Sequence, residues 1–176
     1  TALAQQVRPG ATVEGKSTVP VGTAARLAPA NEAAGATLVW NPEFLREGFA
    51  VKDTLRPDRI VLGLKDGAND NGTGRATIEQ VYAPITATGG IPVVVTDFAT
   101  AELVKVAANS FLATKISFIN AMAEVCEVTG ADVTALAEAI GHDARIGHRF
   151  LHAGLGFGGG CLPKDIRAFM ARAGEL

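Results

Sequence analysis

The glycine-rich stretch before Cys161 is the part of the sequence whose residue types point most clearly to chemistry. Five glycines lie between positions 154 and 160, and Pro163 follows at a position that suits the first turn of a helix. Cys161 is therefore expected just before a helix N-terminus, where the positive end of the helix dipole stabilises a thiolate. Lys164 adds a positive charge nearby, and Asp165 follows. An isolated cysteine is more often an ordinary buried thiol, but this setting predicts a cysteine nucleophile in a loop shaped around a ligand.

Lys105 and Asn109 form a second candidate pair. They are four residues apart in an apolar segment without Gly or Pro, so they share one face of the predicted helix. A lysine in such a place often reaches solvent along its own aliphatic stem, and that interpretation is as strong as a functional one. In the functional interpretation the pair holds a hydroxyl group or a developing oxyanion.

Acidic and hydroxyl side chains are expected at one edge of a sheet. Glu43 and Glu47 follow Asn41 and Pro42, which predicts a helix that is capped by Asn41 and begins where a strand ends. Acidic residues stabilise a helix N-terminus without any catalytic role, which accounts for Glu43 better than for Glu47. Thr18 is expected at the end of another strand, where its hydroxyl would lie at the same edge.

The remaining titratable residues give weaker signals. Arg145 is either a solvated surface arginine or a recognition group for an anionic ligand. His142, His148 and His152 pair with no cysteine at zinc-binding spacing, so no metal site is predicted and they are interpreted as surface or structural residues. Cys126 lies among apolar residues of the long helical segment and is expected to be a packed core thiol.

Alternating strand-like and helix-like segments must position these residues. Strands are predicted at 11–19, 36–40, 58–63 and 91–96, with helices at 24–34 and 76–86. This alternation is typical of the α/β class, with a parallel sheet that helices cover on both faces. Such sheets bind ligands at the carboxyl ends of their strands.

A long helix is predicted after residue 100. Residues 101–128 contain no Gly or Pro and carry apolar residues at helical spacing, which gives roughly 45 Å of helix at 1.5 Å per residue. A helix of that length is expected to span between domains or to form an interface. Gly130 should end it, Asp132 should cap a second helix, and Gly141 should end that one.

Composition excludes several classes of protein. The 176 residues are 48% hydrophobic and 19% charged, with a formal net charge of −2, which allows a real core and argues against nucleic acid or an anionic membrane as the main partner. No signal peptide is expected, and no apolar run in the sequence is long enough to span a membrane. Two cysteines make no disulfide framework, so a reduced, cytoplasmic protein is expected. The first residue is not Met, and the chain is expected to be a piece of something longer.

Four segments resemble the nucleotide-sugar 6-dehydrogenases in the right order and spacing. They are Asn41-Pro-Glu-Phe-Leu-Arg-Glu-Gly48, Pro57-Asp-Arg-Ile-Val61, the segment from Glu102 to Asn120, and Gly156-Phe-Gly-Gly-Gly-Cys-Leu-Pro-Lys-Asp165. The resemblance implies that residues 1–98 are the second half of a Rossmann-type NAD-binding domain. It also implies that residues 99–176 are an all-α central domain, which carries the cysteine loop and forms a homodimer through its long helix.

The resemblance also implies a reaction. The family oxidises a sugar C6 alcohol to a carboxylate with two NAD and without releasing the aldehyde. Cys161 would add to the aldehyde to give a thiohemiacetal, whose oxidation gives a thioester that water hydrolyses. Lys105 and Asn109 would stabilise the oxyanions, Asp165 and Thr18 would position water, and Glu43 would be the general base.

Ligand-binding residues follow from the same resemblance. The UDP-sugar would contact Phe44, Leu45, Arg46, Glu47, Phe150, His152, Leu155, Gly156, Phe157 and Gly158. Arg145 would reach the substrate of the neighbouring subunit. The cofactor NAD would contact Thr18, Glu47, Cys161 and Lys164.

Departures from the family leave alternatives open. Gly160-Cys161-Leu162-Pro163 stands where many relatives have Ser-Cys-Phe-Pro, which should change loop packing more than chemistry. The family's opening Gly-x-Gly-x-x-Gly segment and its last nucleotide-binding domain are not in this sequence, so this piece is expected to turn over poorly alone. UDP-glucose is the favoured substrate, and UDP-N-acetylmannosamine, UDP-N-acetylglucosamine and GDP-mannose are the alternatives. A catalytically silent dimerisation module is the alternative of another class, in which Cys161 would alkylate no faster than Cys126.

Overall fold

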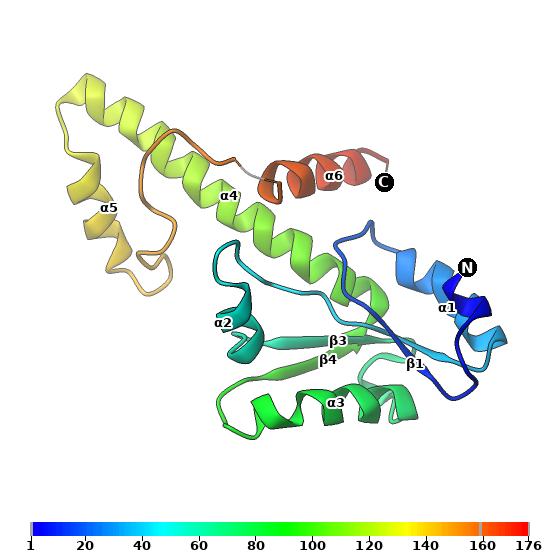
Figure 1. The fold of residues 1–176 in the computed structure, drawn as a ribbon. Coiled ribbons are helices and arrows are strands. Elements are labelled where there is room, and N and C mark those ends of the chain that lie inside the picture. The colour runs from blue at the N-terminus through cyan, green and yellow to red at the C-terminus, as the bar shows by residue number, and fades with distance from the viewer. Residues whose placement is uncertain (1, 159, 176) are drawn as a thin grey trace. The chain divides into compact units, whose positions relative to one another are not determined.

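The computed structural model describes residues 2–158 and 160–175. The chain divides into two compact units, Thr1–Lys105 and Val106–Leu176. The elements are shown in Figure 1. The first unit begins with a 3-10 turn (Leu3–Gln5) and contains β1 (Thr12–Gly15), α1 (Thr23–Ala33), β2 (Thr37–Trp40), α2 (Ala50–Leu55), β3 (Ile60–Leu64), a second 3-10 turn (Gly67–Asn69), α3 (Thr73–Thr86) and β4 (Val93–Asp97). The long helix α4 (Phe98–Thr129) begins in the first unit and continues into the second, which also contains α5 (Val133–Gly141) and α6 (Leu162–Glu175).

The described strands form one four-stranded sheet in the order β1-β2-β3-β4. The α/β class is confirmed, and β1 with β2 and β3 with β4 are parallel as predicted. The pairing of β2 with β3 differs from the prediction, because it is antiparallel through Trp40 and Gly63. The helices α1 and α3 each return the chain to the edge where the preceding strand began. The connection to β3 contains only the six-residue α2, and β3 starts at the edge where β2 ends.

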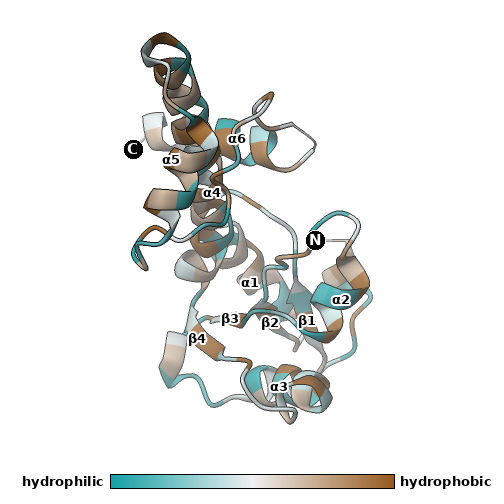
Figure 2. Cartoon of the chain, turned by 90° about the vertical axis from the view of Figure 1, so that its left-hand side faces the viewer, coloured by the Kyte–Doolittle hydropathy of each residue, from teal (hydrophilic) through white to brown (hydrophobic). Residues whose placement is uncertain are grey.

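Helices cover both faces of this sheet. Residues alternate between the faces along each strand, so Leu38 and Trp40 of β2 pack with α1 and the start of α4, whereas Val39 packs with α3. The helix α3 carries both hydrophobic and hydrophilic residues, brown and teal in Figure 2, as expected of a helix with one face on a sheet. β3 is buried along its whole length, in agreement with its continuous apolar sequence.

Two acidic residues fix the start of α4 and its contact with α1. Asp97 accepts hydrogen bonds from the backbone N–H and the hydroxyl of Thr100, so α4 begins at Phe98, three residues before the predicted start. Glu102 is 2% exposed, and its two carboxylate oxygens accept from the backbone N–H groups of Gly22 and Ala24, both at 2.6 Å. A buried carboxylate therefore caps α1 from a distant part of the sequence.

The second unit is helical, as predicted. Gly130 has a φ of 74° and ends α4. The Asp132 side chain accepts from the Thr134 N–H and caps α5, which ends at Gly141. The segment after α5 returns along α4 (orange in Figure 1) to reach α6. Among the described residues, no helix combines the length and hydropathy that crossing a membrane would require.

Two local predictions were wrong. The first strand ends at Gly15 rather than Val19, because the regular pairing with β2 stops after the Asn41 N–H donates to the Gly15 carbonyl, and the next donor, the Glu43 N–H, bonds to Lys16 at 3.4 Å, out of register. Thr18 therefore lies in the loop after β1. The helix expected after Asn41 is also absent from residues 41–46, and α2 begins only at Ala50.

Candidate active site

Lys105 is buried beside Glu43 and Phe44. Its side chain is 8% exposed, its Nζ lies 3.4 Å from Glu43 Oε1, and it lies 5.5 Å from the centroid of the Phe44 ring. The lysine therefore does not reach bulk solvent along its stem. α4 starts at the edge where β4 ends and runs back across the sheet, which brings Lys105 to the edge where β2 ends.

The backbone around Glu43 forms a turn in place of the predicted helix. Glu43 Oε2 accepts from the Leu45 N–H at 2.6 Å, a local bond that competes with helix formation. The Arg59 guanidinium lies 3.9 Å from the centroid of the Phe44 ring, within range of a cation–π interaction. The carboxylate of Glu43 thus holds both its own turn and Lys105.

Arg46 is bound within the same loop. Its Nε and Nη2 donate to the two oxygens of Asp53 at 2.9 and 2.5 Å, and its backbone N–H donates to Asp53 as well. These hydrogen bonds lower the pKa of Asp53 to about 2 and raise the pKa of Arg46. The bidentate pair closes the loop that carries Leu45, Arg46 and Glu47, all of them exposed.

A polar network at the end of β1 and β2 was not predicted. The Asn41 amide donates to Glu14 Oε1 at 2.6 Å and to the Tyr82 hydroxyl at 2.8 Å, and Lys16 Nζ donates to the same hydroxyl. Asn41 is buried and uses its side chain here rather than as a helix cap. The signal available in the sequence was Tyr82, the single tyrosine, on the helix next to this edge.

Asn109 and Asp165 meet in the second unit. Asn109 Nδ2 donates to Asp165 Oδ2 at 2.6 Å, and Asp165 is 1% exposed. The other oxygen, Oδ1, lies 2.9 Å from Lys164 Nζ, although that contact lacks hydrogen-bond geometry. The Asp165 N–H donates to the Cys161 carbonyl, so exposed Cys161 directly precedes α6, as predicted. Cys126 is buried, also as predicted.

The loop between α5 and α6 is held along α4. Lys115 Nζ donates to the carbonyls of Ile146 and Gly147, and Asn120 Oδ1 accepts from the Gly154 N–H. Arg145 is exposed and forms a bidentate pair with Asp143 within this loop. Among the predicted ligand residues of the loop, Phe150, His152, Leu155 and Gly158 are exposed, Gly156 has a φ of 98°, and Phe157 is partly exposed.

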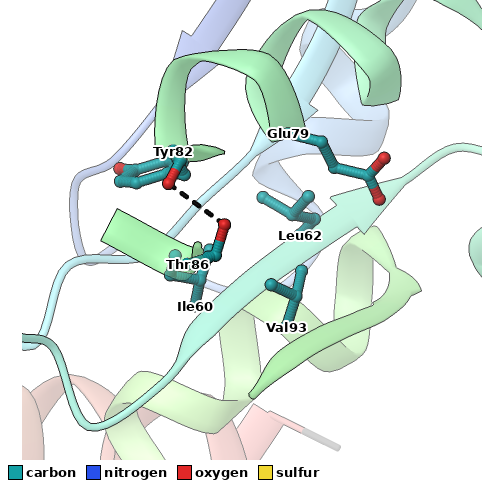
Figure 3. Close-up of a pocket in the computed structure, with 6 residues that line it drawn as sticks. All are labelled: Ile60, Leu62, Glu79, Tyr82, Thr86 and Val93. Carbon is teal, nitrogen blue, oxygen red and sulfur yellow. Dashed lines mark hydrogen bonds between the residues drawn. The ribbon is translucent and has the colours of Figure 1, made fainter. Parts of the chain in front are cut away.

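The candidate residues thus form two clusters. Glu43, Phe44 and Lys105 belong to the first unit, and Asn109, Lys164 and Asp165 belong to the second. Thr18 and Glu47 have no hydrogen bond or ion pair to the first cluster within residues 2–158 and 160–175. A cavity of about 200 Å³ between α3 and β3 (Figure 3) is lined by none of the candidates; its lining is Ile60, Leu62, Glu79, Tyr82, Thr86 and Val93.

Both parts of the chain match the same family. Residues 1–86 match the NAD binding domain of the UDP-glucose/GDP-mannose dehydrogenase family, and residues 99–176 match its central domain. The chain belongs to this family.

Relatives with assigned names support the membership. Over 162 residues the chain is 50% identical to a UDP-glucose 6-dehydrogenase of Rhizobium meliloti (strain 1021), which covers 90% of this chain and 36% of the relative. A UDP-glucose 6-dehydrogenase of Bacillus subtilis (strain 168) is 44% identical over 182 residues, covering 99% of this chain and 39% of the relative. The chain therefore spans little more than a third of these relatives.

Solved structures share the fold. A UDP-glucose dehydrogenase from the archaeon Pyrobaculum islandicum matches with a TM-score of 0.81 at 44% identity, covering 93% of this chain and 37% of that one. A GDP-mannose dehydrogenase from a Pseudomonas species matches with a TM-score of 0.66 at 29% identity, covering 93% of this chain and 38% of that one. The sequence-based recognition of the family is confirmed.

Proposed function

We propose that the protein is an NAD-dependent oxidoreductase that converts the C6 alcohol of UDP-glucose to a carboxylate through a covalent Cys161 thioester. The observation that carries the proposal is the arrangement of α4, where Lys105 and Asn109 share a face and each contacts an acidic residue, Glu43 or Asp165. Cys161 lies one helical turn before that aspartate. The names of the two curated relatives described above favour UDP-glucose as the substrate.

Cys161 supplies the nucleophile. Loss of a hydride from C6 and a proton from its hydroxyl gives an aldehyde, and the sulfur then bonds to the carbonyl carbon as a thiohemiacetal. Loss of a second hydride from that carbon and a proton from its oxygen gives a thioester. A water oxygen then attacks the carbon, the C–S bond breaks, and the free thiol and the acid are released. The position of Cys161 before α6 suits a thiolate, because the helix dipole favours negative charge there.

Lys105 and Asn109 stabilise the oxygen that gains negative charge in these steps. Lys105 is buried, so its charge acts in surroundings where electrostatic interactions are stronger than in water. Glu43 accepts a proton as the general base, and Asp165 and Thr18 orient the hydrolytic water. Asp165 is suited to this role because Asn109 fixes one of its oxygens.

NAD fits the edge of the sheet where β1 and β2 end. The two strands are parallel, so the loops that carry Thr18 and Glu47 leave the sheet at the same edge, which is where such sheets bind dinucleotides. NAD, when bound, accepts the two hydrides. Thr18, Glu47, Cys161 and Lys164 are the residues of this chain that would contact it, and each offers a polar side chain.

The nucleotide sugar is bound by two loops. One is the loop of Phe44, Leu45, Arg46 and Glu47, which the Arg46–Asp53 pair closes. The other contains Phe150, His152, Leu155, Gly156, Phe157 and Gly158, and Asn120 and Lys115 hold that loop along α4. Arg145 is exposed in the same loop and reaches the substrate of the neighbouring subunit.

The long helix α4 forms the homodimer. Phe111, Phe118 and Val125 recur every seven residues and are 66%, 48% and 52% exposed. A seven-residue apolar repeat on one helix face is the pattern that packs against another helix. Both thiols are free, which supports a reduced, cytoplasmic location.

The decisive experiment follows NADH absorbance with the full-length protein, NAD and each nucleotide sugar in turn. UDP-glucose should yield two NADH per molecule, Cys161→Ser should yield no carboxylate, and Cys126→Ala should behave as the wild type. Two NADH from GDP-mannose or a UDP-N-acetyl sugar instead would keep the mechanism and correct the substrate. If the folded protein makes no NADH from any of these sugars, the proposed reaction is wrong and the catalytically silent dimerisation module is the remaining hypothesis.

The thiol-reactivity comparison does not separate these alternatives. Cys161 is exposed and Cys126 is buried, so Cys161 should alkylate faster even if it has no catalytic role. The turnover assay with Cys161→Ser is therefore the informative one.

A further inference from the structure

Glu138, His142 and His148 form a cluster that the proposed reaction does not use. Glu138 and His142 are four residues apart on one face of α5 and its C-cap, and His148 comes from the loop that follows. His142 Nε2 lies 3.3 Å from Glu138 Oε1, and His148 Nδ1 lies 3.5 Å from Glu138 Oε2. One ligand atom from each of the three residues lies within 4.8 Å of the others.

Gly141 makes room for His148 in this cluster. A Cβ at position 141 would lie 2.3 Å from His148 Nδ1, which is closer than any real contact. Gly141 is itself buried. The His148 imidazole therefore packs directly on the backbone at the end of α5. Its Nδ1, the nitrogen that faces Glu138, occupies the space that a side chain at position 141 would fill. The rings of His142 and His148 meet edge to face at 4.9 Å.

The separations within the cluster suit a tetrahedral metal ion better than strong ion pairs. Contacts of 3.3 and 3.5 Å are longer than the usual 2.9 Å of an N–H···O hydrogen bond. Zinc binds imidazole nitrogen and carboxylate oxygen at about 2.0–2.2 Å, and tetrahedral geometry then separates neighbouring ligand atoms by about 3.4 Å. The two imidazoles contact different oxygens of Glu138, so binding requires them to rotate toward a common ion, and both belong to exposed side chains that can rotate.

We propose that Glu138, His142 and His148 bind one divalent transition-metal ion of the zinc class. Two imidazoles and a carboxylate are the ligands that such ions take, and the fourth position is left to water. The site is open, because the three side chains are 66%, 72% and 48% exposed, and a hollow of about 160 Å³ adjoins Glu138 and His148. The bound ion would tie the loop that contains Arg145 to the end of α5.

The test measures zinc binding to the metal-free, full-length protein without a histidine tag. Equilibrium dialysis should give one Zn²⁺ per chain, and Co²⁺ in its place should show the visible absorption bands of a tetrahedral ion. His148→Gln and Glu138→Gln should each weaken binding at least about 10-fold. His152→Gln is the matched control, because His152 lines the same hollow but is not a ligand, and it should bind zinc as the wild type does.

Gly141→Ala is a second test variant, which separates loss of the metal site from loss of binding through misfolding. It keeps all three ligands and improves helix propensity, yet its Cβ must push His148 away, so zinc binding should again weaken at least about 10-fold. Equal zinc affinity in wild type, His148→Gln and Gly141→Ala would overturn the proposal and leave a cluster of surface ion pairs. An equal loss in His152→Gln would overturn this choice of ligands.

Discussion

Lys105 and Asn109 are the residues at which sequence and structure can be compared most directly. Their spacing predicted a shared helix face, and α4 includes both. The spacing could not predict their partners, because Glu43 and Asp165 are far away in sequence. Burial, which excludes a solvated lysine, also depends on the neighbours that the fold supplies.

The Asn109–Asp165 hydrogen bond should contribute measurably to stability. Asn109→Ala leaves an oxygen of a carboxylate that is 1% exposed without its donor. We expect a loss of about 1–3 kcal/mol in the free energy of unfolding, measured by urea denaturation. Asn120→Ala is a suitable control, because its bond to the Gly154 N–H is exposed and its removal should matter less. Equal effects of the two variants would contradict the structure.

Asp53 should give stability that is lost in acid. Its pKa is lowered from 3.8 to about 2 by the Arg46 side chain and then by the Arg46 backbone N–H. For a lowered acid pKa, this contribution is fully present above the unfolded value and disappears as pH falls from about 4 to 2. A carboxyl NMR titration of Asp53 should have its midpoint near pH 2, and Arg46→Met should return it toward 4. A midpoint near 4 in the wild type would show that the pair is not formed.

At the scale of elements, α1, α4 and α5 begin where a side chain accepts hydrogen bonds from their first N–H groups. Asp132 caps α5 from the adjacent position, and this could be predicted from the sequence. The cap of α1 could not be predicted from the sequence, because Glu102 belongs to α4 and lies far from α1 along the chain. The helix expected at Pro42 does not form, and this too depends on residues far away in the sequence. The Asn41 amide, which was expected to cap that helix, donates to Glu14 and Tyr82 instead.

Glu102→Ala should destabilise the first unit. The change leaves the N–H groups of Gly22 and Ala24 without their acceptors, and the Ala24 bond is buried. We expect a loss of about 1–3 kcal/mol in the free energy of unfolding and faster amide hydrogen exchange at the start of α1. Glu32→Ala, which removes an exposed ion pair with Lys65, is the control and should have little effect. Unchanged exchange in Glu102→Ala would show that Glu102 is not the cap.

At the scale of the whole molecule, the proposed homodimer can be tested at the exposed apolar face of α4. Phe118→Glu places a charge in the middle of the Phe111, Phe118 and Val125 repeat, and burying it in a helix–helix interface is unfavourable. The wild type should have twice the monomer mass in light scattering, and Phe118→Glu should be a monomer. Glu127→Lys lies on the opposite side of the helix at 100° per residue and should leave the dimer intact. A monomeric wild type would contradict the proposed interface.

The sequence by itself determined the family, the α/β class, the two parallel strand pairs and the existence of the long helix α4. These features depend on local patterns: apolar periodicity, helix-ending glycines, and motifs that are contiguous in the chain. Cys161 before α6 belongs with them, because the glycines and Pro163 are its immediate neighbours.

Only the tertiary structure decided the antiparallel pairing of β2 with β3, the turn at Glu43 and the partners of Lys105 and Asn109. It also decided that Gly141 admits His148 beside Glu138. Each of these depends on groups that the fold brings together from separate segments. A pattern in a single sequence reflects the secondary structure that a segment prefers, whereas the hydrogen-bond partners and the burial of a residue depend on the rest of the molecule.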